Sequence, residues 1–530
     1  MQLAGLMRAV DWVASRTGWT RLGLAFVSGL GAAASLPPVY ALPLLLIVFP
    51  AVILMLDGLR EAPLKNAALM GWSFGFGFFL GGIYWVGFAF LVDAEDHAWL
   101  LPFVALLFPG GLALFFAAAF AAARYFWTNG PERVLTLTLC LILAEWLRGH
   151  ILTGFPWNLI GYAWGFSDAM LQSASLFGIY GLTLLTTAAA CALAALVSRR
   201  GWNTTPAAVT IPALMAGLLI ANFAFGMIRL ADAGDETVQG VHLRIVQPNT
   251  PQEEKYVPHL RWQNWLRLLE LTNEPGLERI SHVIWPEAAP PFLLDSDPDA
   301  LAMIAEILPP SATLMTGAVR VDRAKGEDQR GTPYNAFQVI DNVGKVMATY
   351  DKAHLVPFGE YLPFADFFEA IGIRKIVVIP GSFGRGPGPR TIKLPDAPPF
   401  GPLICYEIIF PGAVTDPADR PQWLINVTDD SWFKNTSGPR QHLVIARVRA
   451  IEEGLPVIRA ANTGISAVID AYGRVRARID YGRQGILDES LPVALSLTIA
   501  VNLGGYIFAA FCLSLLGWAV FLGRRATPQV

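Results

Sequence analysis

GPLICYEIIF, at residues 401–410, is an apolar run typical of a buried strand, and it carries Cys405, Tyr406 and Glu407 near its end. These three residues place a thiol, a phenol and a carboxylate in a row within an otherwise apolar stretch. The pattern indicates a strand whose end presents polar side chains.

Short strand-like and helical runs surround this stretch between residues 231 and 493. The strand candidates are 241–249, 282–289, 313–321, 334–341, 401–410, 423–430 and 457–470. The helical candidates lie near 253–272, 298–307 and 438–454. This mixed order predicts a sheet layered with helices, that is, an α/β domain.

The chain as a whole is too apolar for an ordinary soluble protein. Of 530 residues, 54% are hydrophobic and 15% are charged, and the mean hydropathy is +0.45. The net charge of −3 gives no basic signal for nucleic-acid binding. About eight apolar stretches approach the roughly 20 residues that a membrane span needs. They lie near 20–36, 39–57, 66–92, 99–123, 133–149, 171–197, 206–230 and 494–523, the first two being short or broken by proline.

The change in texture along the chain predicts three parts. Residues 1–230 form a helical membrane domain of about seven spans, residues 231–493 form a soluble domain, and residues 494–530 form a last span with a short tail. No small-residue cleavage site follows a short apolar core, so the first span is expected to remain as an uncleaved anchor.

Lys and Arg residues in short loops predict the orientation of these spans. The loop after the third predicted span is acidic instead, and Arg148 is an exception after the fifth. The pattern predicts that both termini lie in the cytoplasm and that residues 231–493 lie on the opposite side of the membrane. The basic residues are Arg8, Arg16, Arg21, Arg60, Lys65, Arg124, Arg133, Arg199, Arg200, Arg524 and Arg525.

Cys405 is the single cysteine of the soluble domain, because the other three cysteines fall within predicted spans. It therefore has no partner there for a disulfide, which leaves a buried structural thiol or a functional one. Glu287, after the strand-like run HVIW, and Lys352, in YDKAH, also stand at or just beyond strand ends. A nucleophile, a base and a cation for an oxyanion need these three residue types. Taken singly, Glu287 could be a surface carboxylate and Lys352 a solvated lysine.

Three motifs carry a family resemblance: WPEAA (285–289), DKAHLVPFGEYLP (351–363) and LICYEIIFP (403–411). Together they resemble the Glu–Lys–Cys signature of the nitrilase, or carbon–nitrogen hydrolase, superfamily. With the spans, and with GFPWN (154–158), QPNTPQEEKY (247–256) and SWFKNTSGPRQH (431–442), nearly the whole chain resembles the bacterial apolipoprotein N-acyltransferase family. The resemblance implies a polytopic α-helical membrane domain and an external nitrilase-like αββα sandwich.

The resemblance also implies a mechanism. Cys405 would be the nucleophile, Glu287 the general base, and Lys352 the stabiliser of the tetrahedral oxyanion. An acyl chain, from the sn-1 position of phosphatidylethanolamine, would pass through a Cys405 thioester to the N-terminal amine of a diacylglyceryl-cysteine apolipoprotein. The setting would be the bacterial inner membrane with a periplasmic catalytic domain. We expect no cofactor and, because the histidines are not spaced as ligands, no metal.

The resemblance also gives supporting roles to residues around these three. By family likeness Glu360 would hold Lys352, and Tyr406 and Glu407 would support the nucleophile, although Tyr406 could be a packed aromatic and Glu407 could pair with Arg440. Tyr256 stands where the family usually has Trp, which leaves the lipid-head preference open. The DDSW of 429–432 departs from the usual Asn-Asp pattern, so Asp429 and Asp430 receive no role.

The segment 364–380, FADFFEAIGIRKIVVIP, is unusually apolar for an exposed loop. It could be a lid that dips into the bilayer interface, or a short core helix. The candidate lid and rim residues are Phe364, Phe367, Phe368, Trp432 and Phe433. An apolar lid would favour acyl transfer over one rival function, a membrane-anchored amidase that uses water. The other rival is a non-catalytic membrane scaffold or transporter, and the complete set of Glu287, Lys352 and Cys405 argues against it.

Overall fold

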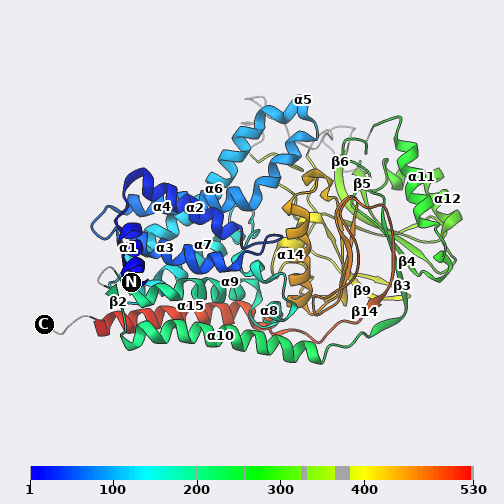
Figure 1. The fold of residues 1–530 in the computed structure, drawn as a ribbon. Coiled ribbons are helices and arrows are strands. Elements are labelled where there is room, and N and C mark those ends of the chain that lie inside the picture. Colours follow the sequence, from blue (N-terminus) through cyan, green and yellow to red (C-terminus); the bar gives the residue numbers. More distant parts are fainter. Residues whose placement is uncertain (1, 199–200, 256, 324–330, 364–381, 527–530) are drawn as a thin grey trace. The chain divides into compact units, whose positions relative to one another are not determined.

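The chain forms two compact units, each assembled from separate segments (Figure 1). The computed structural model describes residues 2–198, 201–255, 257–323, 331–363 and 382–526. The first unit contains Met1–Tyr84, Leu100–Ala233 and Leu497–Val530, and the second contains Trp85–Trp99 and Gly234–Ser496. The short segment Trp85–Trp99 thus belongs with the α/β unit, although the sequence assigned it to the membrane part.

The first unit is helical, and a helix lies in each predicted apolar stretch. A further helix at the N-terminus was not predicted. The main helices are α1 (Gln2–Ser15), α2 (Gly18–Ala33), α3 (Leu45–Asp57), α4 (Leu64–Ile83), α6 (Leu101–Tyr125), α7 (Arg133–His150), α8 (Asp168–Leu171), α9 (Ala174–Ala192), α10 (Pro206–Ala231) and α15 (Ile499–Ala526).

Among the described residues, five helical stretches are both long and apolar enough to cross a membrane. They are Leu64–Leu91, Ala98–Tyr125, Ala174–Leu196, Pro206–Ala231 and Ile499–Phe521. The other three predicted stretches fall short for identifiable reasons. Helix α2 has 16 residues, the apolar helix Leu42–Asp57 is also short, and α7 contains Glu145 and Arg148 within its apolar run. A 16-residue helix spans about 24 Å, less than the hydrocarbon core.

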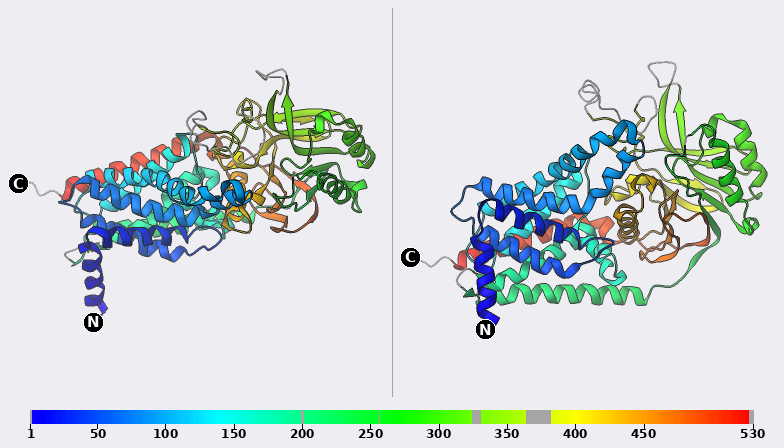
Figure 2. Two further views of the ribbon diagram at one scale, coloured as in Figure 1. Left: turned by 90° about the horizontal axis from the view of Figure 1, so that it is seen from above. Right: turned by 45° about the horizontal axis from the view of Figure 1, so that its top comes forward.

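Glycines let neighbouring helices of this unit approach backbone to backbone. A Cβ on Gly29 of α2 would lie 2.0 Å from the Phe74 carbonyl oxygen of α4, and one on Gly77 would lie 2.2 Å from that of Phe26. Small residues at such contacts are typical of helices that pack within a membrane. At the end of the chain, α15 lies along α9 (Figures 1 and 2). The ring centroids of Phe511 and Phe177 are 5.7 Å apart there.

The second unit contains two six-stranded sheets. The first sheet has the order β14-β3-β4-β5-β6-β7 and the second β13-β12-β11-β10-β9-β8. In each, three central strands are parallel, β3–β5 and β9–β11, and the flanking strands are antiparallel. The strands are β3 (Thr237–Gln247), β4 (His282–Trp285), β5 (Thr313–Asp322), β6 (Thr332–Ile340), β7 (Val346–Asp351), β8 (Ile392–Leu394), β9 (Ala397–Ile404), β10 (Trp423–Thr428), β11 (Val457–Ala461), β12 (Ser466–Ile469), β13 (Val475–Ile479) and β14 (Gly485–Pro492).

Several predicted boundaries were wrong. The strand predicted at 282–289 ends at Trp285. The run 457–470 is two antiparallel strands, β11 and β12, rather than one. The run 401–410 leaves the sheet at Ile404 and continues as a short 3₁₀ helix, Cys405–Ile409. The helix expected at 253–272 begins only at Arg261, as α11 (Arg261–Thr272), because the preceding residues form turns around Pro251 and Pro258.

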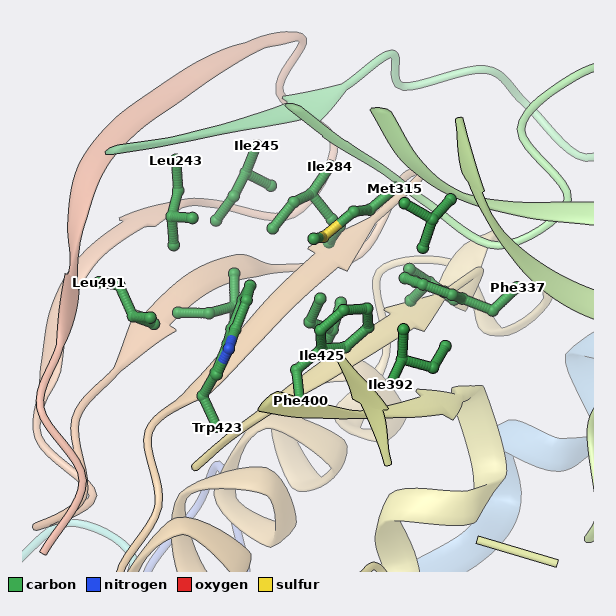
Figure 3. Packing of buried hydrophobic residues seen from close by; sticks show 14 of the residues in the cluster. Leu243, Ile245, Ile284, Met315, Phe337, Ile392, Phe400, Trp423, Ile425 and Leu491 are labelled. Carbon is green, nitrogen blue, oxygen red and sulfur yellow. The ribbon is translucent and has the colours of Figure 1, made fainter. Parts of the chain in front are cut away.

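Apolar side chains from the two sheets meet face to face and form the core (Figure 3). Ile245, Ile284 and Met315 come from the first sheet, and Trp423 and Ile425 come from the second. The outer face of the first sheet is covered by α11 and α12 (Pro298–Ile307). Helix α14 (Ser437–Glu453) contacts the second sheet through β11. The unit is therefore an αββα sandwich, as predicted.

Candidate active site

Lys352 lies directly after β7, and the structure surrounds its ammonium group with carboxylates. The side chain is only 1% exposed. Its Nζ lies 2.9 Å from Oε1 of Glu360 and 3.5 Å from Oε1 of Glu287. Burial opposes the charged form, but the negative charges of Glu360 and Glu287 outweigh it and raise the pKa of Lys352. The lysine is therefore a buried cation held between two carboxylates.

Glu287 follows the C-terminal end of β4 at a tightly packed turn. A Cβ on Gly317 of β5 would lie 2.5 Å from the Glu287 Cα, so only glycine permits this approach. Oε2 of Glu287 accepts a hydrogen bond from the backbone N–H of Asp429 at 3.0 Å. Burial raises the pKa of Glu287, Lys352 lowers it, and the Glu360 charge raises it again. A carboxylate with a raised pKa is suited to proton transfer near neutral pH.

Cys405 occupies the turn between β9 and the short helix Cys405–Ile409, with φ at +51°. This left-handed conformation costs a non-glycine residue about 1–2 kcal/mol, and residues strained in this way are concentrated at functional sites. The Asn426 side chain donates to the Cys405 carbonyl oxygen at 3.3 Å and stabilises the turn. Burial raises the pKa of the Cys405 thiol, Glu287 raises it further, and Lys352 lowers it. The thiol is therefore neutral until a base removes its proton.

Parallel strands bring the three predicted residues together. Glu287 follows the C-terminal end of β4, which pairs in parallel with β5 in the first sheet. Cys405 follows the C-terminal end of β9, which pairs in parallel with β10 in the second sheet. Lys352 follows β7 at the edge of the first sheet, and its backbone N–H donates to the Asn335 carbonyl oxygen at 2.9 Å. The charges of Glu287 and Lys352 both act on the Cys405 thiol. The arrangement can bind and polarise a carbonyl next to a nucleophile and a base.

Asn335, on β6, is a site residue that the sequence did not reveal. Its Nδ2 donates to Oε1 of Glu287 at 2.8 Å and to Oε1 of Glu360 at 2.7 Å. One buried amide group thus bridges the two carboxylates that also contact Lys352. Within the run YNAFQVID an asparagine reads as an ordinary strand residue, so no local signal identifies it.

Glu360 closes the turn that follows Lys352. Its Oε2 accepts the backbone N–H of Val356 at 2.8 Å, while Oε1 contacts Lys352 and Asn335. Phe358, within this turn, has φ at +62° and is 42% exposed. The structure thus places Glu360 beside Lys352, as the family likeness implied.

Glu407 joins the Cys405 turn to the segment after Lys352. Its Oε1 accepts hydrogen bonds from the Tyr350 hydroxyl (2.8 Å) and from the backbone N–H groups of Ala353 (2.7 Å) and His354 (3.1 Å). Its Oε2 accepts the backbone N–H of Ile404 at 2.8 Å. Burial raises the pKa of Glu407, and the Ile404 hydrogen bond and the Lys352 charge oppose that rise.

The suggested pairing of Glu407 with Arg440 is wrong. Arg440 instead donates to the Thr436 carbonyl oxygen and to the Asn435 side chain. The reason is that the N–H groups near Lys352 already satisfy the buried carboxylate. Tyr406 is buried, and its ring packs edge-on against Phe410 with centroids 5.1 Å apart. The structure therefore places Tyr406 as a packed aromatic next to the nucleophile.

Asp429 and Asp430, which the sequence left without a role, lie in two buried ion pairs beside the site. Asp429 accepts from Lys255 Nζ at 2.6 Å. Asp430 accepts from Arg459 at 2.6 Å and contacts the His442 ring at 3.1 Å. Burial works against the charged form of Asp430, but the Arg459 charge prevails and lowers its pKa to about 2. Both aspartates are therefore part of the framework at the end of β10.

The rim candidates have different outcomes. Phe433 packs edge-on against Trp85 with ring centroids 4.6 Å apart, and the Trp85 indole N–H donates to Gln441 at 3.0 Å. Trp432 is half-buried in the same short helix, Asp430–Phe433. The remaining candidates lie outside the described residues: Tyr256, Phe364, Phe367 and Phe368. Among the side chains that the structure describes, no group of three or more His, Cys, Asp or Glu residues is arranged to hold a metal ion.

Known proteins resemble both halves of the chain. Residues 28–193 match the apolipoprotein N-acyltransferase N-terminal domain, and residues 242–496 match the carbon–nitrogen hydrolase family. An apolipoprotein N-acyltransferase from Rhodopseudomonas palustris is 42% identical over 98% of both chains. The one from Bradyrhizobium diazoefficiens is 44% identical over 92% of both. A solved amidase from Nesterenkonia sp. AN1 is 15% identical with a TM-score of 0.35, covering 51% of this chain and 99% of that one. At that level the structural likeness supports no conclusion about activity.

Proposed function

This chain belongs to the apolipoprotein N-acyltransferase family, whose reaction is the N-acylation of lipoproteins, and we propose that it performs this transfer through a thioester on Cys405. The observation that carries the proposal is the buried Lys352 ammonium, 3.5 Å from Glu287 and 2.9 Å from Glu360, with its charge acting on the Cys405 thiol. A base, a cation and a nucleophile in one buried site are the groups that acyl transfer requires.

The first half-reaction forms the thioester. Glu287 takes the proton of the Cys405 thiol, whose raised pKa makes a base necessary. The thiolate attacks the ester carbonyl of a phospholipid, and the Lys352 ammonium, with the backbone N–H of Tyr406, stabilises the negative oxygen of the tetrahedral intermediate. The C–O bond then breaks, and the released lysophospholipid oxygen receives the proton from Glu287.

The second half-reaction transfers the chain to an amine. The free N-terminal amine of a diacylglyceryl-cysteine lipoprotein attacks the thioester carbonyl, and Glu287 accepts an amine proton. The C–S bond breaks as the amide forms, and the Cys405 thiolate is protonated again. Lys352 has the same task in both steps, because the same carbonyl oxygen becomes negative in each. The two lipids would use one pocket in turn, a ping-pong order.

The donor, acceptor and setting belong to the proposal as well. The donor is the sn-1 chain of phosphatidylethanolamine, and the acceptor is the diacylglyceryl apolipoprotein. Residues 1–230 and 494–530 form the inner-membrane part with both termini in the cytoplasm, and residues 231–493 form the periplasmic catalytic domain. Within the part of the chain that the structure describes, five helical stretches are long and apolar enough to span a membrane, which supports this division. The lid at 364–380 stays a prediction, since it lies outside the described residues.

Intact mass spectrometry tests the mechanism. The purified protein is incubated with phosphatidylethanolamine alone, beside Cys405→Ala and, as a matched control, Cys512→Ala on α15. We expect a fatty-acyl adduct on the wild type and on Cys512→Ala, none on Cys405→Ala, and discharge by a diacylglyceryl peptide with a free amine. An adduct on folded Cys405→Ala would refute the assignment of the nucleophile. Discharge by water as fast as by the peptide would favour an amidase.

A further inference from the structure

We propose that Lys255 and Asp429 are positioning residues for Glu287, forming a buried ion pair that clamps the base and balances the charge around it. The two side chains are 5% and 3% exposed. Lys255 Nζ lies 2.6 Å from Oδ2 of Asp429. This inference rests on the role proposed for Glu287 and names the two residues that hold Glu287 in place.

The pair contacts Glu287 on two sides. Lys255 Nζ donates to the main-chain carbonyl oxygen of Glu287 at 3.1 Å. The backbone N–H of Asp429 donates to the Glu287 carboxylate, at Oε2, at 3.0 Å. One contact fixes the backbone of the turn and the other fixes the direction of the carboxylate. A base held at both points keeps its geometry while the substrate exchanges.

The Asp429 carboxylate is held in place by several hydrogen bonds besides its ion pair with Lys255. Both of its oxygens accept from Nδ2 of Asn462 at 3.2 Å, and Oδ1 accepts the backbone N–H of Ser431 at 3.1 Å. The same Asn462 amide donates to the Thr250 carbonyl oxygen at 2.8 Å, which ties in the segment that leads to Lys255. Four chain segments, around residues 250–255, 287, 429–431 and 462, therefore meet at this ion pair.

The pair also sets the charge that Glu287 experiences. The charged groups around its carboxylate are Lys352, Glu360, Asp429 and, once ionised, Cys405. Asn335 and the backbone N–H of Asp429 are neutral donors to it, and Lys255 contacts the main-chain carbonyl oxygen of the same residue. The Asp429 charge raises the pKa of Glu287, and the Lys255 ammonium, 2.6 Å from Asp429, opposes that effect. Loss of Asp429 alone leaves a cation nearby, which favours ionised Glu287. Loss of Lys255 alone leaves an anion nearby, which disfavours it.

The test measures thioester formation against pH, with phosphatidylethanolamine as the only substrate so that no acceptor amine titrates. Its acid limb reports the ionisation of Glu287. We expect Asp429→Asn to move this limb to lower pH and Lys255→Met to move it to higher pH, each by about one unit. The double variant Lys255→Met/Asp429→Asn removes both charges, so its limb should return to the wild-type position.

Asp488→Asn is the matched control, because it removes the carboxylate of another ion pair, 2.6 Å from Arg244, between β3 and β14. It should leave the acid limb unchanged. Limbs that do not move, or that move in the same direction in both single variants, would overturn the clamp while leaving the Cys405 thioester in place. If Lys255→Met does not fold, the other two variants test the clamp. The acid limb should move to lower pH in Asp429→Asn and return to the wild-type position in the double variant. No thioester on the wild type would overturn the proposed function, and the clamp with it.

Discussion

Replacing Asn335 by leucine removes an amide that donates to both site carboxylates. Leucine has the same branched shape and the same number of heavy atoms, and it lacks the donors of the hydrogen bonds of 2.8 Å to Glu287 and 2.7 Å to Glu360. A hydrogen bond to a charged group contributes about 1.5–3 kcal/mol. Losing about 2 kcal/mol of stabilisation of ionised Glu287 raises its pKa by about 1.5 units.

The direction of the effect on activity follows from the protonation state that the mechanism needs. Glu287 must be ionised to take the Cys405 proton, so a higher pKa moves the acid limb of thioester formation to higher pH. At a pH below both limbs, a rise of about 1.5 units lowers the rate about 30-fold. Well above both limbs the two proteins should differ much less.

Single-turnover thioester formation, followed by intact mass between acid and neutral pH, measures this limb. Gln338→Leu is the matched control, because Gln338 is a buried amide three residues further along β6. Its limb should coincide with that of the wild type. A uniformly slower Asn335→Leu with an unmoved limb would refute the reasoning, since it would mean that the amide supports the fold without acting on Glu287.

Three more outcomes follow from single contacts. Tyr350→Phe removes a 2.8 Å hydrogen bond to Glu407 and should lower the free energy of unfolding by about 2 kcal/mol, seen as a lower Tm in detergent, with thioester formation retained; an unchanged Tm would contradict it. Asp430 has its pKa lowered to about 2, so its stabilising contribution is complete above the ordinary value near 3.8 and is lost as the pH falls toward 2. Asp430→Asn should therefore destabilise the protein at pH 7 and much less near pH 2, and an equal loss at both would argue against the ion pair. Gly29→Val would place a Cβ 2.0 Å from the Phe74 carbonyl oxygen, so folded protein should fail to accumulate in membranes; wild-type amounts would show that the helices can separate.

Hydrophobic periodicity identified most of the sandwich, because its central strands are buried and apolar. The helix predicted at 298–307 has the bounds of α12, and the run 241–249 overlaps β3. Four strands were missed, and all four are edge strands of the two sheets: β7, β8, β13 and β14. These strands are short or half-exposed, so their apolar and polar residues alternate weakly.

The sequence by itself determined the class of the protein, because composition and short motifs are local properties. An apolar chain of this length has to bury its helices in lipid, and the motifs around Glu287, Lys352 and Cys405 are contiguous enough to be read directly. Only the tertiary structure decided how these groups are held. Asn335, the Lys255–Asp429 pair and the donors to Glu407 come from segments tens to hundreds of residues apart. A buried polar side chain takes its partner from whatever the fold places within about 3 Å of it, and that neighbour is not encoded in any local pattern.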